Sequence, residues 1–221
     1  MDYERTSASG SSRSSGSRSA GLLLAALAVL AALMGACTTA APAPGTAEAV
    51  DRAVSNSELA ATHIERGDAL YNQGKLEEAI VEYREAARLD PTNANLWMRL
   101  GQVYEQTGRG EDALHSLEKG SEADPGNAGI LNQMGWLYAT AEPATLRDPA
   151  KALAYAQRAV EASGGGDANI LDTLAEAYYA NRQFDKAIET EERALEIAPE
   201  QEALQNQLVK FREAKAAASG R

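Results

Sequence analysis

From about residue 60 onward, small residues, aromatic residues and prolines recur along the chain at a fixed interval of 34 positions. The residues that show this interval are Gly67, Gly101 and Gly135, Ala79 and Ala113, Tyr104 and Tyr138, and Pro91 and Pro125. Self-similarity of this kind indicates a chain built from stacked copies of one supersecondary unit. Few stretches have the composition of β-strands, so each copy is predicted to be helical.

These residues resemble the pattern of the tetratricopeptide repeat, in which each unit is a pair of antiparallel helices. Leu100-Gly101 on the first helix and Ala113 on the second then lie where the helices come closest, because short side chains let the axes approach. Gly108 suits the turn between the two helices. Pro125 ends the second helix, since proline disfavours helical geometry in the residue before it.

The resemblance covers about residues 60–199 and divides this part of the chain into four units. The third unit carries an insertion, because Ala152 follows Ala113 by 39 residues in place of 34. Asp148 before Pro149 suits the start of a helix after this insertion. The units lie near residues 60–93, 94–127, 128–167 and 168–199.

The fourth unit departs from the pattern at two positions. Arg182 stands where the turn glycine is expected, and Glu191 stands where a core residue is usual. The second helix of this unit is therefore expected to pack more loosely than its equivalents.

One more amphipathic stretch, residues 200–221, follows the fourth unit. Leu204, Leu208 and Phe211 share its apolar face, and charged residues cover the other face. A solenoid needs such a helix to close its last hydrophobic face. The predicted fold is all-α: a right-handed α-solenoid of about four antiparallel helix pairs over residues 56–199, with a C-terminal capping helix.

The amino-terminal residues differ in composition from the repeats. An apolar run from Gly21 to Gly35 follows Arg13 and Arg18, a layout typical of an export signal. The run is shorter than the roughly 20 apolar residues that a membrane span needs. Residues 1–36 are therefore predicted to be a lipoprotein signal peptide. An ordinary signal peptide followed by a chance cysteine, or an uncleaved anchor helix, remains the alternative.

The only cysteine, Cys37, follows this run and has no partner for an intramolecular disulfide. The segment Leu33 to Cys37 resembles the bacterial lipoprotein box, which implies cleavage before Cys37 and attachment of three acyl chains to it. Several acyl chains make a permanent membrane anchor, at about 0.8 kcal/mol per buried methylene. Residues 37–55 are then expected to form an acylated, flexible tether, because they contain few large apolar groups.

The residues after the cysteine bear on localisation. Thr38 and Thr39 lack the aspartate that retains similar lipoproteins at the inner membrane. The resemblance therefore implies the outer membrane, facing the periplasm, in a host with two membranes. In other hosts it implies the outer face of the cell membrane.

The formal net charge of the whole chain is −11. Such a surface repels phosphate backbones and anionic lipid headgroups. Nucleic acid is therefore not an expected partner, and contact with the membrane is expected only through the lipid anchor.

In the tetratricopeptide family the inner helices line a concave groove that binds an extended or helical peptide. Carried over by register, the groove residues are Asp68, Tyr71, Asn72, Met98, Gln102, Glu105, Asn132, Trp136, Asp172, Glu176 and Tyr179. The acidic residues favour a basic partner, and the aromatic residues and methionine offer apolar anchors. Packing against the next unit is the alternative role for Trp136, and solvated surface is the alternative for the carboxylates.

The sequence contains no pattern that predicts catalysis. The only histidines, His63 and His115, lie in different units, so no metal site of usual spacing is expected. We expect a scaffold that binds a protein or peptide, and neither an enzyme nor a binder of cofactors or small-molecule substrates. Two narrower hypotheses remain: an assembly lipoprotein similar to those of type IV pili or secretins, and an accessory subunit of an envelope polysaccharide or cell-wall enzyme complex.

Overall fold

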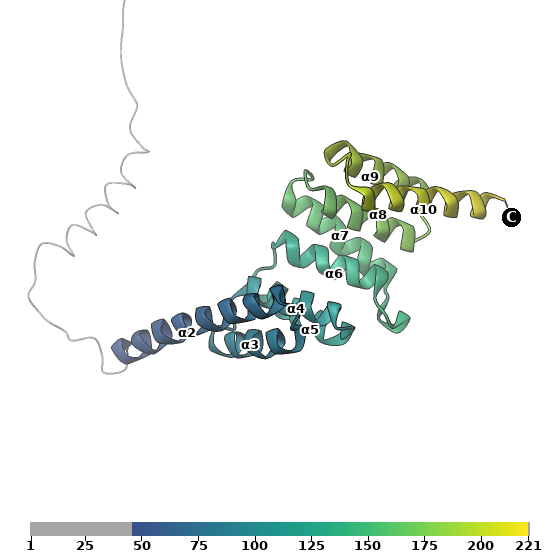
Figure 1. Cartoon of the computed structure of the whole chain (residues 1–221). Helices are drawn as coiled ribbons and strands as arrows, with labels where there is room; N and C mark the ends of the chain where they lie inside the picture. Colours follow the sequence, from purple (N-terminus) through teal and green to yellow (C-terminus); the bar gives the residue numbers. More distant parts are fainter. Residues whose placement is uncertain (1–45, 221) are drawn as a thin grey trace, which may run out of the picture. The chain divides into compact units, whose positions relative to one another are not determined.

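Nine α-helices and one short 3-10 helix make up residues 46–220, the part of the chain that the computed structural model describes (Figure 1). Residues 49–221 form one compact unit by their internal contacts. The helices are α2 (Thr46–Asn72), α3 (Leu76–Leu89), α4 (Ala94–Gln106), α5 (Gly110–Ala123), α6 (Ala128–Thr140), η1 (Ala144–Leu146), α7 (Pro149–Ser163), α8 (Ala168–Ala180), α9 (Phe184–Ile197) and α10 (Glu202–Ser219). The described residues contain no strand, and the predicted all-α fold is confirmed.

Consecutive helices pack in pairs. Helix α4 packs on α5, α6 on α7, and α8 on α9, and the first helices of successive pairs also touch, α4 with α6 and α6 with α8. Helix α10 packs on α9, where a further unit would stand. Each unit therefore buries its hydrophobic face on its neighbours, as in a solenoid. Helices α2, α4, α6 and α8 are called the inner helices below, and α3, α5, α7 and α9 the outer helices.

Small residues hold the two helices of each pair close together. A Cβ atom on Gly101 of α4 would lie 2.8 Å from the Leu117 side chain of α5 and 3.5 Å from the carbonyl oxygen of Ala113. A Cβ atom on Gly135 of α6 would lie 3.1 Å from the backbone nitrogen of Ala156. Ala113 is fully buried. The predicted point of closest approach is confirmed, and it has no room for a larger side chain.

The turns between paired helices use the predicted glycines. Gly74 and Gly108 both have a φ of 73°, a left-handed conformation that costs glycine little. Arg182, which replaces the glycine in the fourth unit, adopts the same region with a φ of 59°. At the other end of the unit, α3 ends at Leu89 and α5 at Ala123, directly before Asp-Pro pairs.

The insertion in the third unit lies between its two helices, where the spacing of the alanines places it. Helix α6 ends at Thr140, the 3-10 helix η1 follows, and α7 begins at Pro149. The Asp148 carboxylate accepts a hydrogen bond from the backbone N–H of Lys151 at 3.1 Å. This N-cap satisfies a backbone donor that the first turn of α7 leaves without a helical partner.

The amino-terminal boundary differs from the prediction. Helix α2 begins at Thr46, so residues 46–55, assigned above to the flexible tether, are helical. This stretch is rich in alanine and contains no glycine or proline after Gly45. The helix that packs in the first repeat therefore continues toward the amino terminus through residues 46–55. The rest of the predicted tether, Cys37 and the signal peptide lie outside the described residues.

The expectation of a loosely packed second helix in the fourth unit is wrong. Helix α9 packs on α8 about as closely as the other outer helices pack on their partners. Glu191, the residue behind that expectation, is 0% exposed. The unit therefore keeps its packing and buries a carboxyl group inside it.

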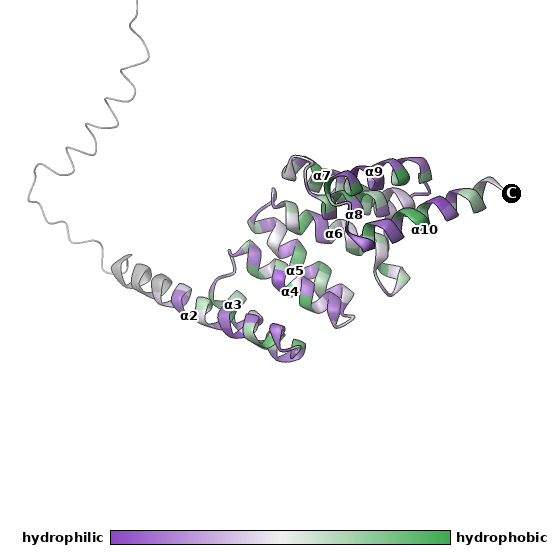
Figure 2. Cartoon of the chain, turned by 45° about the horizontal axis from the view of Figure 1, so that its top comes forward, coloured by the Kyte–Doolittle hydropathy of each residue, from purple (hydrophilic) through white to green (hydrophobic). Residues whose placement is uncertain are grey.

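Each helix carries both hydrophobic and hydrophilic residues (Figure 2). The largest fully buried side chains include Tyr83 of α3 and Phe211 of α10, which belong to separate hydrophobic clusters of the first unit and the cap. Among the helices described, none is both long and apolar enough to span a membrane.

Candidate peptide-binding groove

Polar side chains on one inner helix bind those on the next inner helix along the chain. Gln102 and Gln106 of α4 donate hydrogen bonds to the Tyr71 hydroxyl of α2 at 3.1 and 2.6 Å. Arg99 of α4 donates to the Asp68 carboxylate of α2. The partners are 31 or 35 residues apart, about one repeat. The predicted groove positions of α2 and α4 therefore lie on one surface.

Asp68 links three helices. The Tyr83 hydroxyl of α3 donates to Asp68 Oδ1 at 2.6 Å, and Arg99 of α4 binds the same oxygen. Burial raises the pKa of Tyr83, and the neighbouring Asp68 raises it further. Charge-assisted hydrogen bonds of this kind are strong, so the charge of Asp68 is largely satisfied within the protein.

Glu105 of α4 and Trp136 of α6 form the middle of this surface, and both are partly buried. Burial raises the pKa of Glu105, and the neighbouring Trp136 side chain lowers it. No neighbouring positive charge contributes to the pKa of Glu105. In the described part of the chain, Glu105 is thus an acidic group without a cation of its own.

A cavity of about 210 Å³ lies beside Glu105 and is also lined by Thr140 and Glu142. Helices α4 and α6 end at its rim, at Gln106 and Thr140, and α5 begins there at Gly110, where the N–H groups of the first turn carry partial positive charge. The carbonyl groups at helix C-termini carry partial negative charge. The exposed Glu142 pairs with Arg147 at 3.1 Å, so among the described residues Glu105 is the carboxylate on this lining that has no ion-pair partner. The cavity therefore suits the cationic end of a partner's lysine or arginine side chain.

Met98 and Asn132 lie between neighbouring units. A Cβ atom on Gly129 of α6 would lie 2.9 Å from Met98 Sδ, so the methionine packs directly on the next inner helix. The side-chain oxygens of Asn132 and of the adjacent Gln133 are buried without a hydrogen-bond partner among the described residues. Packing therefore occupies Met98, and the two amides keep unused acceptors.

In the fourth unit, the capping helix supplies the partners of the groove residues. Glu176 of α8 accepts hydrogen bonds from Lys210 Nζ at 2.6 Å and Gln207 Nε2 at 3.1 Å, both on α10. Lys210 Nζ also lies 4.6 Å from the centre of the Tyr179 ring, and Tyr179 packs on Phe211. Helix α10 thus covers the groove residues of this unit.

Asp172 lies beside Glu176 and also faces Glu191 of α9. Burial, and after it the charge of Glu176, raise the pKa of Asp172 to about 6. Asp172 therefore gains a proton more readily than an exposed aspartate does.

Sequence comparison identifies the repeat. A family model described as TPR repeat matches residues 67–108, and models described as tetratricopeptide repeat match residues 94–127 and 144–202. The chain belongs to the tetratricopeptide repeat family. TPR domains bind protein or peptide partners, and this TPR protein is accordingly a scaffold for protein–protein interaction. No curated protein sequence matches it significantly.

Solved TPR structures share its fold. MamA is 24% identical, with a TM-score of 0.60 over 72% of this chain and 84% of MamA. PilF of Pseudomonas aeruginosa is 20% identical, with a TM-score of 0.62 over 74% of this chain and 72% of PilF. PilW, described as a widely conserved type IV pilus biogenesis factor, is 18% identical, with a TM-score of 0.63 over 70% of this chain and 69% of PilW. At these identities the likeness concerns the fold alone.

Three residues that the TPR register did not single out complete the groove. Arg99 neutralises Asp68, and Gln207 and Lys210 bind Glu176. A signal for two of them is present in the sequence, because Arg99 follows Asp68 by 31 residues and Lys210 follows Glu176 by 34, about one repeat each. Asn72 and Gln102, by contrast, are exposed side chains at predicted positions.

The histidines show no arrangement for metal binding. His63 Nδ1 lies 2.7 Å from a Glu82 carboxylate oxygen, whereas His115 is exposed on α5. Within the described range, no three His, Cys, Asp or Glu side chains are placed to hold a metal ion.

Proposed function

We propose that this TPR protein is a lipid-anchored scaffold of the bacterial cell envelope whose inner-helix groove binds a peptide segment containing a basic residue and a large apolar residue. The observation that carries the proposal is that Glu105, beside Trp136, lines a small cavity and makes no ion pair with any described residue. A basic side chain of the partner would meet the Glu105 carboxylate there, and Trp136 would contact its apolar neighbour.

The other groove carboxylates are less available to a partner. Asp68 is bound by Arg99 and Tyr83, and Glu176 is bound by Lys210. A peptide that bound Asp68 or Glu176 would first have to break these internal hydrogen bonds, and the free energy needed to break them would lower its affinity. The centre of the groove is therefore the part that selects for a basic residue.

The envelope location rests on the amino-terminal sequence. The apolar run before Cys37 and the small residues around it resemble a lipoprotein signal, and acyl chains on Cys37 would hold the scaffold on a membrane surface. In a host with two membranes the groove would then face the periplasm.

Site-specific photo-crosslinking in the host tests the groove. A photoreactive amino acid at the exposed Gln102 should capture a discrete partner, and the same amino acid at the exposed Glu189 of the outer helix α9 should not. In a protein that carries the photoreactive amino acid at Gln102, the additional substitution Glu105→Lys should reduce the amount of crosslinked partner about tenfold. The new lysine would repel the basic residue of the partner. Glu111→Lys, an equal charge change on α5, is the matched control. Equal capture from Gln102 and Glu189, or no effect of Glu105→Lys, would contradict this function.

A narrower role in type IV pilus or secretin assembly is the second candidate, because PilF and PilW share the fold. Deletion of the gene should then remove surface pili, and the Glu105→Lys protein should fail to restore them. Normal piliation of the deletion strain would exclude this role and leave the general scaffold in place.

A further inference from the structure

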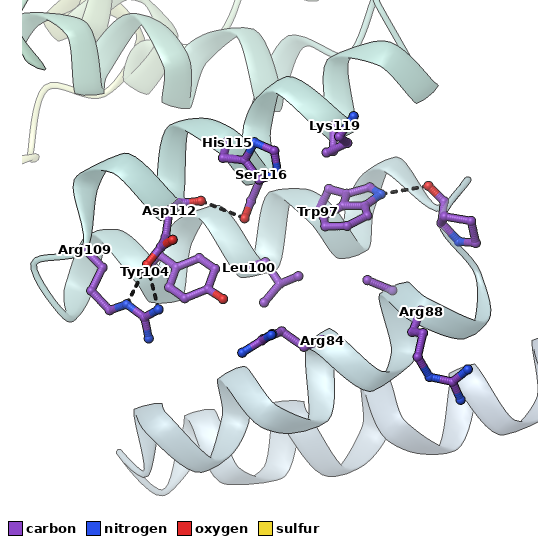
Figure 3. A pocket seen from close by; sticks show the side chains of 12 residues that line it. Arg84, Arg88, Trp97, Leu100, Tyr104, Arg109, Asp112, His115, Ser116 and Lys119 are labelled. Carbon is purple, nitrogen blue, oxygen red and sulfur yellow. Dashed lines mark hydrogen bonds and ion pairs between the residues drawn. The ribbon is translucent and has the colours of Figure 1, made fainter.

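A second cleft lies on the outer side of the first two units, away from the groove residues. It has a volume of about 690 Å³ and runs between the outer helices α3 and α5, over the inner helix α4 (Figure 3). Trp97 and Tyr104 of α4 form part of its floor, and Arg84, Arg88, Arg109 and Lys119 stand around it.

The charge of this cleft is opposite to that of the chain. Four basic side chains and a single carboxylate, Asp112, line it, in a protein whose net charge is −11. Arg109 pairs with Asp112 and, at 3.7 Å, with Glu77. Arg88 pairs with Glu85 and Lys119 with Glu122, and neither glutamate lines the cleft. Arg84 makes no ion pair with any residue that the structure describes. These are exposed surface pairs of low strength, so an incoming carboxylate can compete for the cations.

The floor of the cleft is aromatic. The Arg109 guanidinium lies 4.5 Å from the centre of the Tyr104 ring, and the Trp97 indole N–H donates to the Pro91 carbonyl at 2.8 Å. Burial raises the pKa of Tyr104, and the nearby charges of Arg84 and Arg109 lower it. Both rings are thus fixed in place next to positive charge, an arrangement suited to a ligand that combines carboxylates with one apolar side chain.

The repeat itself shows that these features are not required by the fold. One repeat further along, the positions of Arg84 and Arg88 hold Glu118 and Glu122. The position of Ser116, which lines the open cleft, holds Tyr155 in the next unit. Tyr155 stacks on Tyr138 with ring centres 5.7 Å apart, so the equivalent space there is filled. The cleft between α3 and α5 is therefore open and basic because its residues differ from those at the equivalent positions of the next repeat.

We propose that the cleft between α3 and α5 docks an acidic segment of a partner protein, with an apolar side chain of that segment against Trp97. The site lies on a different face from the inner-helix groove and is independent of the function proposed above. A scaffold with both sites would hold two partners at once, a basic segment inside and an acidic segment outside.

A defined peptide probe tests this site on the purified full chain. The probe is a fluorescein-labelled peptide with three glutamates on each side of a tryptophan, and its glutamine equivalent is the peptide control. Fluorescence anisotropy should show saturable binding of the acidic probe that weakens as salt concentration rises, and little binding of the glutamine peptide. Arg84→Glu with Arg88→Glu should weaken binding at least tenfold.

Two further variants distinguish the effect of the shape of the cleft from the effect of the total charge of the protein. Ser116→Tyr copies the filled cleft of the next unit and should weaken binding to a similar extent without a change in far-UV circular dichroism. Arg66→Glu with Arg193→Glu makes the same total charge change at exposed arginines outside the cleft and should leave affinity within about twofold. Equal loss of binding in this control, no binding by the wild-type chain, or tighter binding of inorganic polyphosphate than of the acidic peptide would overturn the proposal.

Discussion

The carboxyl groups of Glu191 on α9 and Asp172 on α8 face each other inside the fourth unit, under the capping helix. Glu191 is 0% exposed and occupies the position that Tyr83 and Leu117 fill in the first two units. Neither Glu191 oxygen has a donor among the described residues, and two ionised carboxylates cannot hydrogen-bond to each other. Burial, and after it the neighbouring Asp172, raise the pKa of Glu191 to about 8. Glu191 therefore keeps its proton at neutral pH and shares it with Asp172.

This pair predicts that the protein becomes less stable as pH rises. A carboxyl with a raised folded-state pKa stays protonated in the native protein where the unfolded chain has lost its proton, so the free energy of unfolding falls between about pH 4.5 and about pH 8. Glu191→Gln should remove most of this slope and increase stability above pH 8 by about 1–3 kcal/mol, since each unit of pKa corresponds to about 1.4 kcal/mol. Urea unfolding of both proteins across this pH range provides the measurement.

An exposed glutamate on the same helix is the control for this prediction. Glu196→Gln changes the same chemical group in solvent and should leave the pH slope as in the wild type. A wild-type stability that does not fall from pH 5 to pH 8.5 would show that Glu191 is not the proton carrier.

The turn of the fourth unit carries a backbone conformation that glycine would relieve. Arg182 has a φ of 59°, whereas the equivalent Gly74 and Gly108 have 73°. Arg182→Gly should stabilise the protein by about 0.5–1 kcal/mol. The left-handed conformation costs a residue with a side chain about 1–2 kcal/mol, which glycine avoids. Part of this gain is lost because glycine has more conformational freedom in the unfolded chain. Arg182→Ala should give no such gain, since it removes the side chain and keeps the strain.

Gly108→Ala is the reciprocal change. Nothing lies within 4 Å of a Cβ atom built on Gly108, so only the left-handed backbone opposes the substitution. A loss of about 1 kcal/mol in the free energy of unfolding is expected. If Gly108→Ala were neutral, the turns would tolerate any residue and the prediction for Arg182 would also fail.

Much of the fold follows from residues whose chemistry restricts the backbone. Gly101, Gly108 and Ala113 each act at one point of contact or one turn, and their spacing was enough to predict the helix pairs. The start of α2 was missed because residues 46–55 lie before the first copy of the 34-residue pattern, and their helical state depends on continuity with the packed helix. Position 191 was misjudged because sequence alone does not show that a neighbouring carboxyl can share its proton.

The candidate groove was predictable only as a set of positions. Register places Asp68, Glu105 and Glu176 on the inner helices, but the availability of each charge depends on residues one repeat away in the next helix. Arg99 reaches Asp68 and Lys210 reaches Glu176, whereas Glu105 meets Trp136. These pairings depend on the offset between units, which the sequence of one unit does not contain. The outer cleft was missed because it results from the small Ser116 of α5 beside Arg84 and Arg88 of α3.

Overpacking at the helix contact tests the register directly. Ala113 of α5 is fully buried against α4, where a Cβ atom on Gly101 would already collide with Leu117. Ala113→Leu should lower the free energy of unfolding by about 1–3 kcal/mol, because the pair must separate to admit the larger side chain. Ala162→Leu, at an exposed position of α7, should have little effect. Thermal or urea unfolding followed by circular dichroism measures both, and an unchanged midpoint for Ala113→Leu would contradict the register.

The proposed membrane anchor depends on one sulfur atom. If Cys37 carries the acyl chains, Cys37→Ser should move the protein from the membrane fraction to the soluble fraction of host cells, because each buried methylene contributes about 0.8 kcal/mol and no helix between Thr46 and Gly220 can replace the anchor. Thr38→Ser, the adjacent position, is the control and should remain with the membrane. Metabolic labelling with radioactive palmitate should mark the wild type and the control and leave Cys37→Ser unlabelled. Membrane retention of an unlabelled Cys37→Ser protein would instead assign the anchor to an uncleaved apolar run from Gly21 to Gly35, and the lipoprotein interpretation would be wrong.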